Sequence, residues 1–167
     1  MTTPTPETEN SSEYRYTTDG GISVIRRMTT ITYENATEGL IDALDQTKGV
    51  LLSSSYEFPG RYSRWDMGFD TPPLEITGRE RGFAVVRALR DLFAHKGDER
   101  LGLYGAFGYD IALHFEQINL TQDRPADHKD IHLFLPDHLI TVDHASRVAT
   151  KIEYEFITPD GHSTVGL

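Results

Sequence analysis

The 167-residue chain contains no cysteine. This absence excludes disulfide bridges, thiolate catalysis and cysteine-ligated metal centres. The sequence also has no apolar run long enough to cross a bilayer. Residues 1–12 are mostly Thr, Pro, Glu, Asn and Ser, without the basic and apolar regions of a signal peptide. We therefore expect a cytoplasmic protein in which residues 1–12 form a disordered tail.

Positive charge is scarce in this sequence. The chain has 16 Lys and Arg residues against 26 Asp and Glu residues, which gives a net charge of −10 at pH 7. Such a surface repels phosphate backbones, so we expect no nucleic-acid partner. The hydrophobic fraction of 38% is enough to build a core, and the length suits one domain or a fragment of a larger one.

Strand and turn signals predict an α+β fold, with a mostly antiparallel sheet and about two packed helices. The predicted strands are residues 22–33, 50–57, 62–69, 74–77, 101–109, 131–135, 139–142 and 149–157. The strands 50–57 and 62–69 are expected to form a hairpin. The strand 74–77 follows Pro72-Pro73 and is expected at a sheet edge. The glycine-spaced strand 101–109 is expected to be buried, with its backbone close to a neighbour.

Two segments have the pattern of helices. Asn35 offers an N-cap for a helix over residues 36–47, and Glu38 would complete a capping box. Residues 83–94 carry apolar side chains at 85, 86, 89, 92 and 93, which is the spacing of an amphipathic helix. A shorter helix is expected over residues 111–116.

Two short patterns suggest catalysis but lack the residues it needs. Gly102, Gly105 and Gly108 do not have the Gly-x-Gly-x-x-Gly order, and no Lys-Ser/Thr follows them, so we interpret them as sites of close backbone packing. The serines at 53–55 lack a Gly-x-Ser-x-Gly elbow and a nearby histidine. Neither pattern predicts a catalytic residue.

The histidines also predict no metal site. His128 and His132 are four residues apart, but Pro125 argues against a helix that would bring them together. We expect His128, His132, His138 and His144 to be exposed or hydrogen-bonded.

The segment 49–69 combines hydroxyls, acids, two arginines and the single Trp. Ser53 and Ser54 lie beside Leu51 and Leu52, so hydroxyl groups and an apolar wall could together hold a small amphipathic ligand. Four charged residues of the hairpin are expected to form a structural cross-strand ion-pair ladder, with Trp65 partly buried. They are Glu57, Arg61, Arg64 and Asp66.

Three blocks of sequence occur in order along the chain. They are Leu51–Glu57 with Pro59–Asp66, Gly102–Asp110 with Phe115-Glu116, and Phe134–Asp137 with Val142–His144. Together they resemble the N-terminal region of anthranilate synthase component I, in the bacterial form fused to its glutamine amidotransferase. The resemblance runs from about Ser23 to the C-terminus, and it implies that residues 13–167 are this regulatory domain, truncated before the catalytic region.

The resemblance implies a part in tryptophan biosynthesis, in a carbon–oxygen lyase that converts chorismate and glutamine to anthranilate, pyruvate and glutamate. It implies feedback inhibition by L-tryptophan, bound at Leu51, Leu52, Ser53 and Ser54, with Ser53 in place of the family's glutamate. The implied partners are the catalytic region and the glutamine amidotransferase component. Mg²⁺ is expected in that catalytic region, so no cofactor, metal or catalytic residue is expected in this chain.

Two departures from the family bear on activity. The chain stops at Leu167, before the chorismate and magnesium region, and it passes from Thr77 almost directly to the 83–94 helix, where relatives carry a longer segment. The chain alone is therefore expected to be inactive. Two alternatives stay open: the matching part of a sister chorismate enzyme, such as aminodeoxychorismate synthase or a phenazine-pathway synthase, and a non-enzymatic module that binds a small ligand or a partner.

Overall fold

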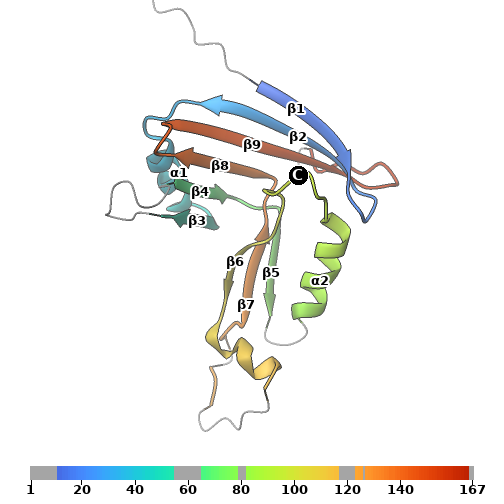
Figure 1. Cartoon of the computed structure of the whole chain (residues 1–167). Helices are drawn as coiled ribbons and strands as arrows, with labels where there is room; N and C mark the ends of the chain where they lie inside the picture. Colours follow the sequence, from blue (N-terminus) through green and yellow to red (C-terminus); the bar gives the residue numbers. More distant parts are fainter. Residues whose placement is uncertain (1–10, 55–64, 79–81, 117–122, 126, 166–167) are drawn as a thin grey trace, which may run out of the picture.

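A computed structural model of the chain describes residues 11–54, 65–78, 82–116, 123–125 and 127–165. Its described strands form two antiparallel sheets, in the orders β1-β2-β9-β8-β4-β3 and β5-β7-β6 (Figure 1). The strands are β1 (Ser11–Thr17), β2 (Ser23–Ile31), β3 (Gly49–Ser53), β4 (Trp65–Asp70), β5 (Leu74–Gly78), β6 (Tyr104–Phe107), β7 (Ile131–Leu135), β8 (His138–Asp143) and β9 (Val148–Ile157). With two α-helices beside them, this arrangement confirms the predicted α+β class.

The main core lies between the two sheets. In β9 the side chains of Ile152, Tyr154 and Phe156 are buried at every second position, as expected for a strand with one face against a core. Phe69 of β4 meets Phe134 of β7 edge to face, with ring centroids 6.1 Å apart. This contact joins the smaller sheet to one face of the larger sheet, and it leaves β3 and β6 on either side of a groove described below.

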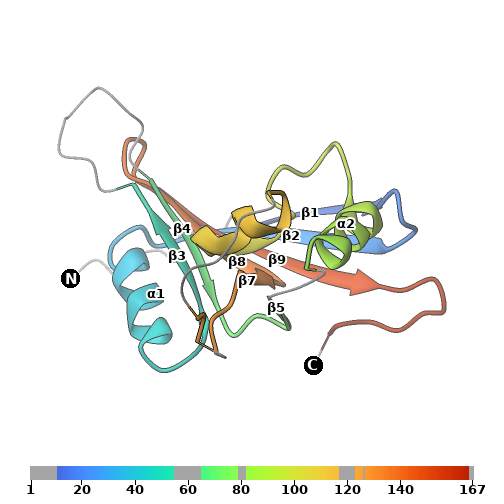
Figure 2. The same cartoon turned by 90° about the horizontal axis from the view of Figure 1, so that it is seen from below.

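The two α-helices lie on either side of β7 (Figure 2). Helix α1 (Ala36–Leu44) packs on β3, β4 and β8 and buries Leu40. Helix α2 (Gly82–Phe93) packs beside β5, and its Phe93 meets Phe156 of β9. A 3-10 helix, η1 (Tyr109–His114), replaces the short helix predicted over 111–116. Among the described helices, none is long and apolar enough to cross a membrane.

The predicted capping box of the first helix is wrong. Asn35 does occupy the N-cap position, but its backbone is left-handed, with φ at 64°, and its side chain makes no capping hydrogen bond. A capping side chain normally reaches the N2 or N3 amide from an extended backbone. The helix also ends at Leu44, three residues before the predicted end at 47.

Two strand predictions also need correction. Residues 11 and 12, expected in a disordered tail, begin β1, which pairs with β2 from Ser11 opposite Thr29; residues 1–10 lie outside the described part. The strand predicted over 101–109 is only β6, and it is exposed rather than buried because it forms one edge of the smaller sheet. The predicted edge strand 74–77 is confirmed as β5 at the opposite edge.

The close backbone packing predicted for the glycine strand is confirmed at two positions. A Cβ atom on Gly105, whose φ is +149°, would lie 2.2 Å from the carbonyl oxygen of His132. A Cβ atom on Gly108 would lie 2.8 Å from the carbonyl oxygen of Lys129. Gly102, in contrast, has open space around it.

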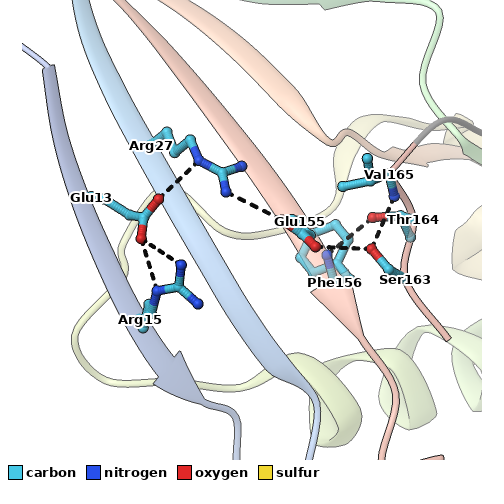
Figure 3. A network of polar contacts seen from close by, with 8 residues as sticks. All are labelled: Glu13, Arg15, Arg27, Glu155, Phe156, Ser163, Thr164 and Val165. Carbon is cyan, nitrogen blue, oxygen red and sulfur yellow. Dashed lines mark hydrogen bonds and ion pairs between the residues drawn. The ribbon is translucent and has the colours of Figure 1, made fainter. Parts of the chain in front are cut away.

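An exposed polar network ties the outer strands of the larger sheet together (Figure 3). Arg27 of β2 bonds to Glu13 of β1 at 3.0 Å and to Glu155 of β9 at 3.3 Å. Ser163 donates to the same Glu155 at 3.0 Å, so the segment after β9 is attached as well. Hydrogen bonds from Arg15 and Arg27 lower the pKa of the Glu13 carboxyl.

Candidate functional site

The predicted ligand residues lie along β3 and at its end. Leu51, Leu52 and Ser53 belong to β3, and Ser54 follows it. The Ser53 hydroxyl donates to Asp66 Oδ1 at 2.6 Å. The Ser54 hydroxyl accepts from the backbone N–H of Trp65 and donates to its carbonyl, both at 3.1 Å. These bonds fix the end of β3 against β4.

Asp66, with only 5% of its surface exposed, is the buried centre of a partly exposed polar cluster. Its carboxylate accepts hydrogen bonds from Ser53, from Thr37 at 2.9 Å and from His144 at 2.8 Å. Burial alone would raise its pKa, but the bonds from Ser53, His144 and Thr37 outweigh burial, and the pKa lies below the usual value. The other ring nitrogen of His144 lies 2.9 Å from the Tyr33 hydroxyl.

This cluster corrects the interpretation of Asp66 as part of a surface ion-pair ladder. The other three members proposed for the ladder, Glu57, Arg61 and Arg64, lie outside the described residues. Asp66 is buried because β8 pairs with β4 and brings His144 over it. The expectation that Trp65 is partly buried is confirmed, and Arg100 lies 5.0 Å above its ring.

The order of the groups in this cluster fits a structural role rather than nucleophilic catalysis. A serine nucleophile needs a histidine in direct contact as its base, with the carboxylate behind the histidine. Here Asp66 stands between Ser53 and His144, and the second nitrogen of His144 faces Tyr33. The cluster therefore positions β3, β4, α1 and the turn after β8 relative to one another.

Leu51 and Leu52 line an open groove of about 690 Å³ between β3 and the smaller sheet. Leu52 is 45% exposed there. The groove is lined by Leu44, Thr47, Lys48, Gly49, Val50, Leu51, Leu52, Glu75, Gly105, Ala106, His132 and Phe134. Leu51 and Leu52 form part of its apolar wall, whereas Ser53 and Ser54 are not among the lining residues.

The groove also carries three ionisable side chains that the sequence did not assign to a site. Glu75 of β5 lies between Lys48, whose Nζ is 2.8 Å from one carboxylate oxygen, and His132 of β7, whose Nε2 is 2.9 Å from the other. The bonds from Lys48 and then His132 lower the pKa of Glu75. The three residues are too far apart in sequence to form a motif. The one available signal was the outward position of Glu75 next to the buried Ile76 on a predicted edge strand.

Comparison with known proteins identifies a relative of this chain. No family model matches it. A curated protein, "Anthranilate synthase" from Azospirillum brasilense, is 35% identical over 211 residues, which cover 92% of this chain and 29% of the relative. The chain is related to anthranilate synthase. This finding confirms the resemblance carried by the three blocks of sequence.

The matched stretch of the anthranilate synthase relative is longer than this whole chain, at 211 against 167 residues. The relative therefore has residues in this stretch without a counterpart here. The chain spans 29% of the relative's length.

A second buried carboxylate, missed in the sequence, organises a separate polar cluster of this anthranilate synthase-related chain. Asp98 accepts from the hydroxyls of Tyr16 at 2.9 Å and Tyr154 at 3.2 Å, and it pairs with Arg26 at 3.1 Å. Burial and the bonded carboxylate raise the pKa of both tyrosines, which keeps them neutral. This cluster attaches the loop after α2 to the larger sheet.

His128, His132, His138 and His144 each have a hydrogen-bond or ion-pair partner, and His128 and His132 do not converge. His132 faces Glu75, whereas His128 lies 3.5 Å from Asp110. Asp110, His128 and Asp130 have ligand atoms within 4.8 Å of one another. Arg124 forms ion pairs with Asp110 and Asp130, and its positive charge offsets theirs.

Proposed function

We propose that this chain is the N-terminal regulatory part of an anthranilate synthase. The observation that carries the proposal is the 35% identity to the Azospirillum brasilense enzyme over 92% of the chain. The complete enzyme would convert chorismate and glutamine to anthranilate, pyruvate and glutamate. Its catalytic region, with Mg²⁺, and its glutamine amidotransferase component would be the partners of this chain.

The regulatory ligand in this proposal is L-tryptophan. Leu51 and Leu52 supply an apolar wall for its indole ring, in a groove whose volume is within the range of small-molecule sites. Ser53 and Ser54 hold the end of that wall, because their hydroxyls bond to Asp66 and to the backbone of Trp65. Feedback inhibition would follow if tryptophan in this groove changed how the chain meets the catalytic region.

A chimera tests this function. This chain would replace the matched region of the Azospirillum brasilense enzyme, and anthranilate fluorescence would be followed with chorismate, glutamine and Mg²⁺, with and without L-tryptophan. We expect anthranilate formation that tryptophan inhibits, with the parent enzyme as the control. A folded chimera that makes no anthranilate contradicts the assignment to this enzyme. Turnover that tryptophan does not inhibit contradicts the regulatory role.

A further inference from the structure

A second pocket, of about 440 Å³, lies at the Trp65 end of β4. Three neighbouring strands of the larger sheet, β4, β8 and β9, form it together with Arg100, which comes from the segment between α2 and β6 (Figure 1). The described residues that line this pocket are all different from those that line the groove beside β3. The two are therefore separate places on the molecule.

The Arg100 side chain is half-buried in this pocket and lacks a carboxylate partner. Its guanidinium group lies 5.0 Å above the centre of the Trp65 ring and 3.6 Å from Met67 Sδ, which is a weak acceptor. No ion pair links it to a carboxylate in the part of the chain that the structure describes. A guanidinium group has several N–H donors, so most of those of Arg100 remain available to a ligand.

The backbone of Arg100 is held in place on both sides of its Cα atom. Its N–H donates to the buried carboxylate of Asp98 at 3.1 Å, and its carbonyl accepts from the Tyr104 hydroxyl at 2.5 Å. The Trp65 ring restricts the side chain as well, because a cation is attracted to the face of an indole ring. Donors that are already positioned lose less conformational entropy when a ligand binds.

The other polar groups of the pocket select the kind of anion. Thr141, Ser146 and Thr150 supply hydroxyl groups, which can donate or accept hydrogen bonds. The exposed Asp143 also lines the pocket, and its carboxylate accepts from the backbone N–H groups of Ala145 and Ser146. One arginine beside one carboxylate favours a singly charged anion over a phosphate group, which carries more negative charge.

We propose that this pocket binds a small hydroxylated carboxylate. The ligand carboxylate would accept a pair of N–H bonds from Arg100, because the planar guanidinium group matches a carboxylate in a bidentate pair. The ligand hydroxyl groups would bond to Thr141, Ser146 and Thr150. The pocket volume is within the range of small-molecule sites. This inference goes beyond the proposed function, since it involves neither tryptophan nor the groove beside β3.

Trp65 is the single tryptophan of the chain, so its fluorescence reports on this pocket directly. The 167-residue chain would be titrated at pH 7 and constant ionic strength with three probes: D-gluconate, sorbitol, in which CH₂OH replaces the carboxylate, and inorganic phosphate. We expect a saturable change with gluconate, none with sorbitol and weaker binding of phosphate. Arg100→Met should weaken gluconate binding about tenfold or more. Thr150→Val should weaken it less, because it removes an uncharged partner.

Arg15→Met is the matched control, because it removes the same charge from an exposed arginine of β1 outside the pocket. Urea denaturation checks that each variant is folded, and Thr150→Val carries the test if Arg100→Met is not. Three results overturn the proposal: an equal loss in Arg15→Met, an equal response to sorbitol, or a wild-type chain in which neither fluorescence nor calorimetry detects gluconate binding. Tighter binding of phosphate than of gluconate rejects the carboxylate, and calorimetric competition by L-tryptophan rejects a separate site.

Discussion

Asp66 is the residue on which the proposed regulatory strand depends. Replacing it by Asn would remove the negative charge that three donors share, and it would turn an NH₂ group toward at least one of them. We expect Asp66→Asn to lower the free energy of unfolding by roughly 2–4 kcal/mol, as breaking a buried charged group commonly does. Urea denaturation at pH 7 measures this loss.

Acid titration gives a second readout for the same variant. The pKa of Asp66 is lower in the folded state than in the unfolded state. Its contribution to the free energy of unfolding is therefore fully present above the unfolded pKa of about 4, and it is lost as the pH falls through the folded pKa. The difference between wild type and Asp66→Asn should shrink below pH 4. Asp91→Asn, at an exposed ion pair of α2, is the control and should change stability little. A loss as small as that of the control would contradict the role of Asp66.

His138 has the opposite dependence on pH. Its hydrogen bond to Asp137 raises its pKa against the effect of burial, and Asp70 adds to the rise. The stabilisation is therefore fully present below the unfolded pKa of about 6.5 and is lost as the pH rises through the folded pKa. We expect His138→Gln to be less stable than wild type at pH 6, by up to about 1 kcal/mol, and nearly equal to it at pH 9.

Thermal or urea melts at the two pH values test this sign. The exposed His162, 83% accessible, provides a control substitution to Gln that should show no such change. A His138→Gln difference that grows from pH 6 to pH 9 would refute the assigned direction.

At the scale of the element, the pairing of β6 with β7 depends on Gly105. An Ala side chain there meets the His132 carbonyl and also needs a positive φ, which Ala disfavours. We expect Gly105→Ala to destabilise the chain by roughly 1–3 kcal/mol. Gly102→Ala, three residues earlier in open space, should have a much smaller effect. Equal urea midpoints for the two variants would contradict the close approach.

Some elements follow from local signals. β7 matches its predicted range of 131–135, and β9 and α2 match theirs within one residue at each end, because alternation and helical spacing depend only on neighbouring residues. The strand predicted over 101–109 failed because its length and burial depend on its place at a sheet edge. The glycine and aromatic residues of this segment do not indicate whether it lies at the edge or in the middle of a sheet.

For the whole molecule, we expect no anthranilate from the 167-residue chain alone. The chain spans 29% of the related enzyme, and the chorismate and magnesium region lies, by resemblance, outside these residues. Anthranilate fluorescence with chorismate, Mg²⁺ and ammonia should equal a control without protein. The comparison sample contains the remaining region of the Azospirillum brasilense enzyme as a separate chain. Turnover by the 167-residue chain alone would overturn its regulatory assignment.

The sequence by itself determined the fold class, most strand and helix positions, the relation to anthranilate synthase and the apolar wall at Leu51 and Leu52. These properties reside in residue order and in short-range periodicity. The tertiary structure alone decided that Asp66 is buried under His144 and that Glu75 stands between Lys48 and His132. Both clusters join segments that lie far apart in sequence. They form only when β4 pairs with β8 and β7 pairs with β5, and strand order has no local signature.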